Sequence, residues 1–187
     1  MNLCILTVSI FYGVSTMADI DGFAPIVSGN ARVLILGTMP SEASLLRRQY
    51  YGHPRNTFWP IMGTLLDFAP NLCYQRRKTL LMDNGIAVWD VLQSCYRLGS
   101  LDSNIKLETI KSNDFAGFFT EHKSIKQVFF NGKMAEKLYQ KRVLPTLKHR
   151  FPYLEYQCLP STSPAYAALK FEKKLEAWKA IKQSMVK

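Results

Sequence analysis

Closely spaced cysteines are absent from the sequence. Its four cysteines, Cys4, Cys73, Cys95 and Cys158, lie at least 22 residues apart. Structural zinc sites and iron–sulfur sites use cysteines only a few residues apart. The sequence therefore predicts no metal site and favours reduced thiols in a cytoplasmic protein.

Long apolar segments are also absent. The longest apolar run, residues 3–14, is interrupted by polar residues and is too short to span a bilayer. We therefore predict no membrane attachment, and the composition, 48% hydrophobic and 20% charged, is that of a globular protein. Residues 1–16 are interpreted as an upstream or poorly ordered extension, and residues 17–187 as a single domain.

Several motifs of nucleotide-binding and hydrolytic sites are missing. The chain contains no GxxxxGK[ST] or GxGxxG phosphate loop and no GxSxG nucleophile elbow. Acidic residues are scarce too, since 14 Asp and Glu stand against 24 Lys and Arg, a formal net charge of +10. This excess of positive charge favours a polyanionic partner such as a nucleic acid.

Hydrophobic patterning predicts alternating strands and helices. Short apolar runs closed by polar or turn residues predict four buried strands over residues 32–37, 85–90, 126–131 and 155–160. Apolar residues at intervals of three and four predict helices over residues 57–68, 73–83, 112–121, 132–144 and 171–185. This order is typical of a three-layer α/β/α fold around a central, mostly parallel four-stranded sheet.

The loops after these strands are expected to form one site, because ligands of parallel sheets bind beyond the carboxyl ends of the strands. The four strand ends are GTMPS (37–41), WDV (89–91), FNG (130–132) and LPSTSPA (159–165). The ring-rich segment YYGHPRNTFW (50–59) follows the first of them. The Asn131 carboxamide complements a nucleobase edge, although a simple Asn-Gly turn is the other interpretation. The three hydroxyls of the last loop suit phosphate binding, although a simple rigid turn is the other interpretation of this loop.

Together these segments resemble the uracil-DNA glycosylase superfamily over residues 22–185. GTMPS, QYYGHPRNTFW, GIAVWDV, FNG and LPSTSPA, in this order, are similar to the hypoxanthine-DNA glycosylases that form family 6 of the superfamily. The resemblance implies a monomeric, monofunctional deoxyinosine glycosylase of base excision repair in the bacterial or archaeal cytosol. Its partner would be DNA containing deaminated bases, and it would need no cofactor.

The resemblance also implies the site residues. Asn56 is the catalytic residue and positions water or the sugar. The base-binding residues are Phe58, which stacks on the flipped base, with Asn131, Met39 and Tyr51. The DNA-binding candidates are Ser41, His53, Arg55, Ser161, Thr162, Ser163 and Tyr166. A structural hydrogen bond to the loop is the other interpretation of His53, and a solvated surface position that of Arg55.

The sequence departs from the superfamily pattern in two loops. Met39 stands where monofunctional relatives carry a catalytic Asp or Asn, so we hypothesise that Asn56 supplies the missing group. Leu159 stands where several branches carry His, and Ser163 where they carry an aliphatic wedge. Strand separation is therefore assigned to Pro164 or Tyr166. Asp90 is interpreted as bracing a loop.

Three other functions stay open at this point. A mismatch-type uracil-DNA glycosylase would share the scaffold and the PxNxFW element. A catalytically silent nucleic-acid-binding module is favoured by Met39 and Leu159. A nucleoside hydrolase is disfavoured by the positive charge.

Overall fold

A parallel sheet forms the centre of the protein. The computed structural model describes residues 19–186, so the interpretation of residues 1–16 lies outside the described residues. The strands are β2 (Val33–Gly37), β3 (Ile86–Asp90), β6 (Gln127–Asn131) and β7 (Glu155–Leu159), and they pair in parallel in the order β3-β2-β6-β7. The four predicted strands are thus confirmed to within a residue or two at their ends.

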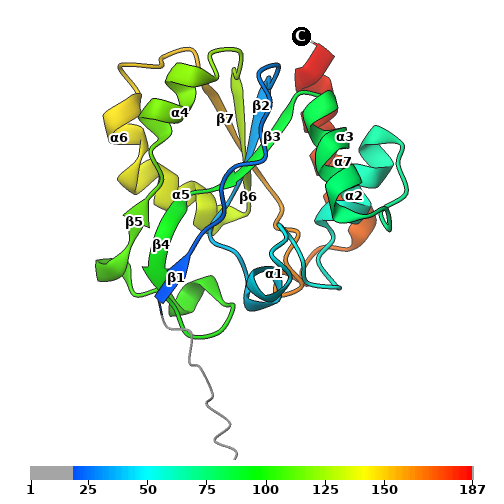
Figure 1. Ribbon diagram of the computed structural model, residues 1–187, viewed down its shortest axis with the longest axis horizontal. Helices are drawn as coiled ribbons and strands as arrows, with labels where there is room; N and C mark the ends of the chain where they lie inside the picture. The colour runs from blue at the N-terminus through cyan, green and yellow to red at the C-terminus, as the bar shows by residue number, and fades with distance from the viewer. Residues whose placement is uncertain (1–18, 187) are drawn as a thin grey trace, which may run out of the picture.

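Helices cover both faces of this sheet (Figure 1). One face carries α2 (Phe58–Leu66), α3 (Tyr74–Asp83) and α7 (Phe171–Val186). The other carries α4 (Phe115–Glu121), α5 (Lys133–Arg142) and α6 (Leu144–Leu147). The predicted three-layer α/β/α fold is therefore confirmed. Within residues 19–186 no helix has both the length and the apolarity that a bilayer span requires.

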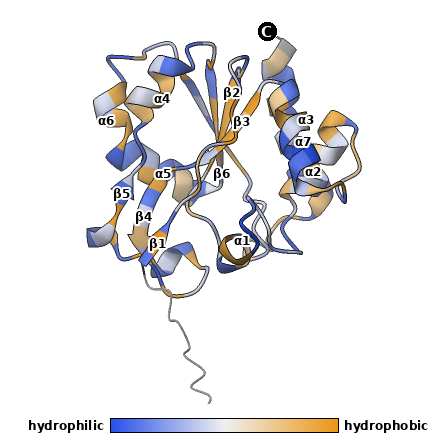
Figure 2. Cartoon of the chain, in the orientation of Figure 1, coloured by the Kyte–Doolittle hydropathy of each residue, from blue (hydrophilic) through white to orange (hydrophobic). Residues whose placement is uncertain are grey.

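Burial on both faces explains the composition of the central strands. Every residue of β2 and β3 is buried, and these strands are among the most hydrophobic parts of the chain in Figure 2. A strand covered by helices on both sides has no solvent face, so its apolar residues do not alternate with polar ones.

A second, smaller sheet was not predicted. It contains β1 (Asp19–Asp21), β4 (Leu92–Tyr96) and β5 (Lys111–Ser112), paired antiparallel in the order β1-β4-β5. Two short 3₁₀ turns, η1 (Asp102–Asn104) and η2 (Leu107–Thr109), lie between β4 and β5. The small sheet holds the segment after β4 next to the carboxyl ends of the central strands.

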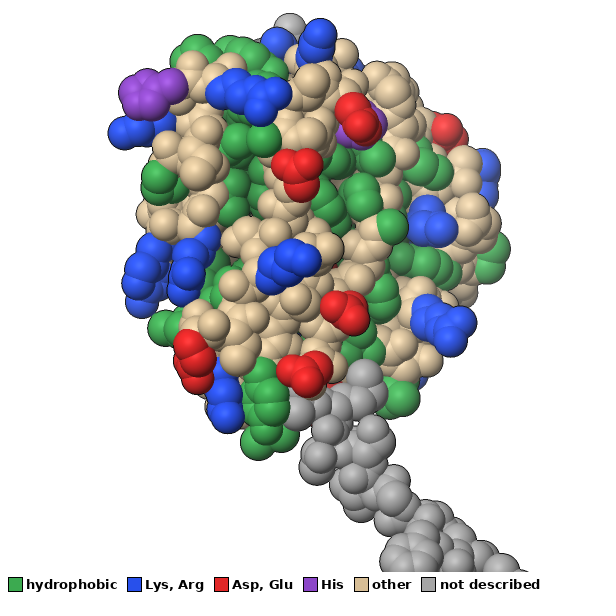
Figure 3. Space-filling view, turned by 60° about the vertical axis from the view of Figure 1, so that its left-hand side comes forward, with side chains coloured by type: hydrophobic (Ala, Val, Ile, Leu, Met, Phe, Trp, Pro, Cys, Tyr) green, Lys and Arg blue, Asp and Glu red, His purple; other side chains and the backbone are tan. Residues whose placement is uncertain are grey.

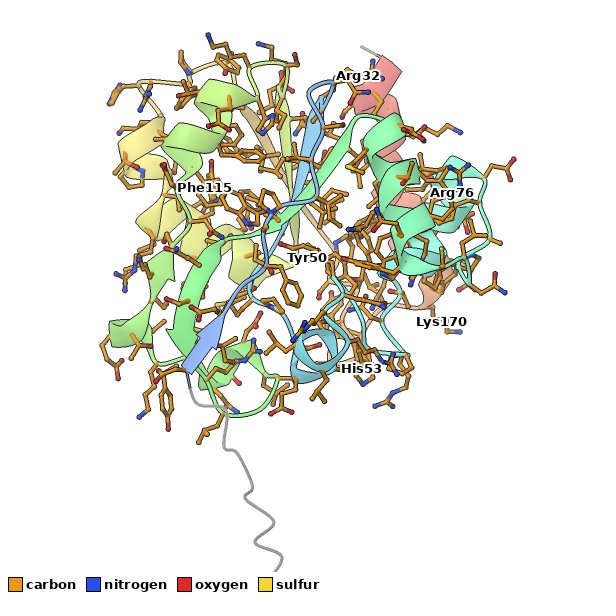
Figure 4. The ribbon with its side chains drawn as sticks, viewed as in Figure 1. Arg32, Tyr50, His53, Arg76, Phe115 and Lys170 are labelled. Atoms are coloured by element: carbon orange, nitrogen blue, oxygen red, sulfur yellow. The ribbon has the colours of Figure 1, made fainter. Side chains whose placement is uncertain are left out.

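All four central strands end on the same side of the protein. Arg32, just before β2, lies at one end of the molecule, whereas His53 lies at the opposite end beside α1 (Glu42–Arg47) (Figure 4). Tyr50 lies between them near the centre of the view. The loops with the candidate residues therefore gather at the end marked by His53 and α1.

Candidate functional site

One cavity of about 270 Å³ opens where the four strands end. All four predicted loops contribute to it, together with a segment after β4 that was not predicted. Its lining comprises residues 37–41, Ser44, Tyr50, Tyr51, Asn56, Asp90, residues 100–102, Asn131, residues 161–163, Ala165 and Tyr166. Within residues 19–186 no three His, Cys, Asp or Glu side chains are grouped as a metal site needs.

Hydrogen bonds fix the first loop to the ring-rich segment. Ser41 is the N-cap of α1, and its hydroxyl accepts a hydrogen bond from the Ser44 amide at 3.3 Å. The Ser44 hydroxyl in turn accepts from the Gly52 amide at 3.0 Å. Met39 lines the cavity with only 7% of its surface exposed, so it contributes an apolar wall.

Asn56 lies at the cavity and also supports the start of α2. Its Oδ1 accepts a hydrogen bond from the Phe58 amide at 2.9 Å, which fixes the plane of the carboxamide. Its Nδ2 makes no hydrogen bond with residues 19–186. The side chain is thus held in place with one N–H₂ group and one Oδ1 lone pair available.

Tyr51 lines the cavity, whereas Phe58 does not. Phe58 is fully buried and does not line the cavity, because the first turn of α2 directs it toward Trp59 and Trp178. Tyr51 covers it, with ring centroids 3.8 Å apart and planes inclined by 21°. The structure therefore places Tyr51, and not Phe58, in the lining of the cavity, and the stacking of Phe58 on a base stays a prediction.

Asn131 is engaged with Thr162 on both sides of its carboxamide. Its Nδ2 donates to the Thr162 hydroxyl at 2.8 Å, and its Oδ1 accepts from the Thr162 amide at 2.8 Å. The carbonyl of Thr162 accepts from the Thr57 amide at 3.0 Å. Thr162 is completely buried, and these hydrogen bonds make it the junction of β6, α2 and the last loop. Its predicted contact with DNA stays a prediction.

The other predicted DNA-binding residues lie around the mouth. Ser161, Ser163 and Tyr166 line the cavity, and Tyr166 is 39% exposed. His53 lines a neighbouring hollow of about 280 Å³ that shares Tyr51 and Asn56 with the main cavity. Arg55 is exposed beside it.

A buried group of charged residues was missed by the sequence analysis. Arg97 is fully buried, its Nε donates to the Gly99 carbonyl at 2.9 Å, and its Nη1 lies 3.6 Å from Asp102 Oδ1. Its Nη2 donates to the Pro40 carbonyl. Arg97 thereby fixes the segment after β4 to the first loop. No spacing motif marks this residue, so the sequence carried no local signal for it.

Asp90 lies at the floor of the cavity, 3% exposed. Burial raises the pKa of its carboxyl group to about 8, with a further contribution from the charge of Asp102, while Arg97 acts in the opposite direction. Its backbone carbonyl accepts from Asn113 at 2.8 Å, but carboxyl Oδ2 has no partner in residues 19–186. The bracing expected of Asp90 is thus made by its backbone and not by its carboxyl group.

Comparisons with known proteins agree with this arrangement. Residues 24–182 match the model of the family described as the uracil DNA glycosylase superfamily. A protein of Methanosarcina barkeri named hypoxanthine DNA glycosylase is 39% identical over 114 residues, which are 60% of this chain and 71% of that protein. A protein of Methanosarcina acetivorans with the same name is 35% identical over 134 residues, 67% of this chain and 84% of that protein.

A solved structure extends the agreement to the fold. It is a solution NMR structure of a candidate uracil DNA glycosylase from Methanosarcina acetivorans. The TM-score is 0.74 and the sequence identity 32%, over 90% of this chain and 99% of that one. The similarity thus extends beyond the cavity loops to nearly the whole described chain.

Proposed function

The chain belongs to the uracil DNA glycosylase superfamily, and we propose that it is a monofunctional DNA glycosylase that releases hypoxanthine from deoxyinosine in DNA. The observation that carries the proposal is Asn56, held at the cavity by its hydrogen bond to the α2 backbone. The names of the two Methanosarcina relatives support the choice of base. The candidate uracil DNA glycosylase structure makes uracil the second candidate substrate.

The cavity suits a single base swung out of the helix. Its volume of about 270 Å³ is below the range of about 300 to 1,000 Å³ typical of drug-sized ligands. A base must leave the stack before its glycosidic bond becomes accessible. Tyr51 would stack on this base, and Phe58 behind it would keep the tyrosine ring in place. Met39 would form an apolar wall.

Asn56 would act on the reacting atoms. Hydrolysis adds water to C1′ while the sugar develops positive charge and the base takes the electron pair of the broken bond. The free lone pair of Asn56 Oδ1 can orient the water, and Nδ2 can donate to the sugar or the base. The Asn131–Thr162 hydrogen bonds hold the wall beside Asn56, because Thr162 also bonds Thr57. The second N–H and the second lone pair of the Asn131 carboxamide would serve the base edge.

DNA would bind across the mouth of the cavity. The hydroxyls of Ser41, Ser161 and Ser163 lie at this mouth and suit phosphate contacts, with His53 and Arg55 on the side of the neighbouring hollow. On the face in Figure 3, Lys and Arg side chains are spread among acidic ones. We therefore assign the net charge of +10 to long-range attraction. The reaction needs neither a metal ion nor an organic cofactor, and we propose a cytoplasmic monomer.

The test compares three asparagine variants on labelled duplexes containing one deoxyinosine, deoxyuridine or deoxyxanthosine. Asn56→Ala should slow formation of abasic sites about a hundredfold or more in single-turnover assays. It also removes a helix-terminal hydrogen bond that contributes about 1 kcal/mol. Asn84→Ala is the matched control, because Asn84 Nδ2 bonds the Leu80 carbonyl at the end of α3, outside the cavity. It should keep full activity.

Asn56→Asp separates the two atoms of the carboxamide. It keeps the acceptor for the Phe58 amide and loses the N–H₂ group. A rate well above that of Asn56→Ala would assign the water to Oδ1, whereas equal loss would assign the role to Nδ2. A near wild-type rate in Asn56→Ala would remove Asn56 from the mechanism. Tight binding without cleavage by the wild type would favour a silent binding module, and turnover of free inosine alone would favour a nucleoside hydrolase.

A further inference from the structure

We propose that Asp90 is a second catalytic residue of this site, which donates a proton to the purine ring as the base departs. The inference deepens the proposed glycosylase function and rests on it. It gives the cavity a chemical reason to prefer purines. It is carried by the position of the Asp90 carboxyl group and by what surrounds it.

The carboxyl group belongs to a residue that lines the cavity floor, and it is almost completely enclosed. Asp90 is the last residue of β3 and pairs with Gly37, the last residue of β2. Its Oδ1 packs against Gly37 so closely that a Cβ there would collide with it. Its Oδ2 is buried without a partner in residues 19–186. A buried polar atom without a partner costs about 1–3 kcal/mol, a cost that a bound ligand can remove.

The surroundings of Asp90 favour its protonated form. Arg97 is the cation that lowers the pKa of Asp90. Its three side-chain nitrogens are directed elsewhere: Nη1 lies 3.6 Å from Asp102, Nε donates to Gly99 and Nη2 donates to Pro40. Asp102 adds negative charge, and burial with this charge raises the pKa of Asp90 to about 8. The other titratable groups that face it are Tyr50, Tyr51 and Tyr74, whose pKa values are also raised by burial, so they are neutral. At pH 7 the carboxyl group therefore carries a proton that it can donate.

Purines offer this proton an acceptor that uracil lacks. The imidazole ring of a purine carries a free ring nitrogen, N7, in addition to the carbonyl groups shared with pyrimidines. When the C1′–N9 bond breaks, its electron pair moves to the base, and the Asp90 proton forms an N–H bond on the ring. The attacking water forms the C1′–O bond and returns a proton to Asp90. The net reaction is addition of one water molecule, with release of hypoxanthine.

A second buried atom supports the same assignment. The Tyr51 hydroxyl is buried beside the Asn131 side chain, makes no hydrogen bond of normal geometry within the described residues, and would lie 3.4 Å from a Cβ at Gly37. Tyr51 and Asp90, two residues of the cavity lining, thus each carry a buried polar atom without a hydrogen bond of normal geometry near Gly37. A ligand with several polar edge atoms, such as a purine, can satisfy both.

The experiment measures single-turnover release of hypoxanthine and uracil from duplexes between about pH 6 and 10, for the wild type, Asp90→Asn and Asp90→Ala. Wild-type release of hypoxanthine should fall about tenfold per pH unit above pH 8. Asp90→Asn retains a donor of the same shape but cannot transfer a proton. It should be about a hundredfold slower at pH 7 and lose the alkaline fall. Release of uracil should change much less.

The outcomes distinguish a failure of the Asp90 role from a failure of the glycosylase function. An active wild type whose Asp90→Asn variant keeps both the rate and the alkaline fall would refute the role of Asp90 alone. A wild type inactive on every duplex would refute the glycosylase function, and the role of Asp90 with it. Asp83→Asn, which removes an exposed carboxylate at the end of α3, should behave as wild type. Thermal unfolding of each variant identifies a loss of rate that comes from unfolding.

Discussion

At the scale of single residues, Gly37 is the position where the smallest change should matter most. Gly37→Ala would place a methyl group against Asp90 Oδ1 in a fully buried strand end. We expect a loss of about 1–3 kcal/mol in the free energy of unfolding, because overpacking shifts the neighbours. Displacement of the Asp90 carboxyl should also slow hypoxanthine release. Urea unfolding and single-turnover rates measure the two effects.

Gly29→Ala provides the control for this substitution. A Cβ at Gly29 would have no atom within 4 Å, so the methyl group added there would contact no other residue. We expect unchanged activity and a stability within about 0.5 kcal/mol of wild type. If both variants behaved alike, the close approach of Asp90 to Gly37 would have no functional consequence.

Residues around the site could be predicted in kind but not always in position. The sequence indicated rings, a carboxamide and hydroxyls after parallel strands, and all of these types line the cavity. Phe58 and Tyr51 were both expected at the base, yet only the fold decides which ring covers the other. Thr162 looked like a surface hydroxyl, because no local pattern reveals that its amide and carbonyl bind Asn131 and Thr57.

At the scale of elements, the Asn131–Thr162 pair should be a main support of the last loop. Asn131→Ala would leave the amide and hydroxyl of a completely buried threonine without partners. We expect a loss of about 2–4 kcal/mol in the free energy of unfolding, since each unsatisfied buried group costs about 1–3 kcal/mol. Gln157→Ala, on an exposed position of β7, should change stability little. Equal stability of the two variants would contradict this supporting role.

The last loop also presents the ring assigned to strand separation. Tyr166 lies at the rim of the cavity, and its backbone carbonyl accepts a hydrogen bond from Lys174 Nζ at 2.7 Å. We predict that Tyr166→Ala slows cleavage of paired substrates more than that of single strands, because only a duplex must be opened. Tyr153→Ala is a matched control, since Tyr153 is 38% exposed, close to the 39% of Tyr166, and lies outside the cavity. Equal losses on both substrates would remove the wedge role from Tyr166.

Elements buried on both faces could be predicted, whereas those at the edge could not. The central strands are continuous apolar runs because helices cover both sides, and such runs are readable from the sequence. β4 lies in a small sheet and mixes buried with exposed residues over only five positions. β1 and β5 have three and two residues. Hydrophobic patterns over so few residues cannot be distinguished from those of ordinary loops. The segment with Arg97 and Asp102 was therefore missed.

At the scale of the whole molecule, the buried Asp90 should make stability depend on pH. Its pKa is about 8 in the folded protein and 3.8 when unperturbed, so between these values the folded state binds one proton more than the unfolded state. The contribution of Asp90 is therefore fully present below about pH 4 and is lost as pH rises toward 8. The expected slope is about −1.4 kcal/mol per pH unit. Above about pH 8, Asp90 no longer contributes to the pH dependence of stability.

Asp90→Asn isolates the contribution of Asp90 to the pH dependence of stability. The wild type and the variant share every other titrating group, among them Asp102. An amide stays uncharged at every pH. The free energy of unfolding of the variant, relative to that of the wild type, should therefore rise by about 1.4 kcal/mol per pH unit between about pH 4 and 8. Urea unfolding of both proteins at several pH values measures the difference. A constant difference would mean that Asp90 is charged in the folded protein at neutral pH, and it would also remove the proton on which purine release is proposed to depend. A stabilised but slow Asp90→Asn variant would instead show that the site retains an unpaired carboxyl group at the expense of stability, because its chemistry requires it.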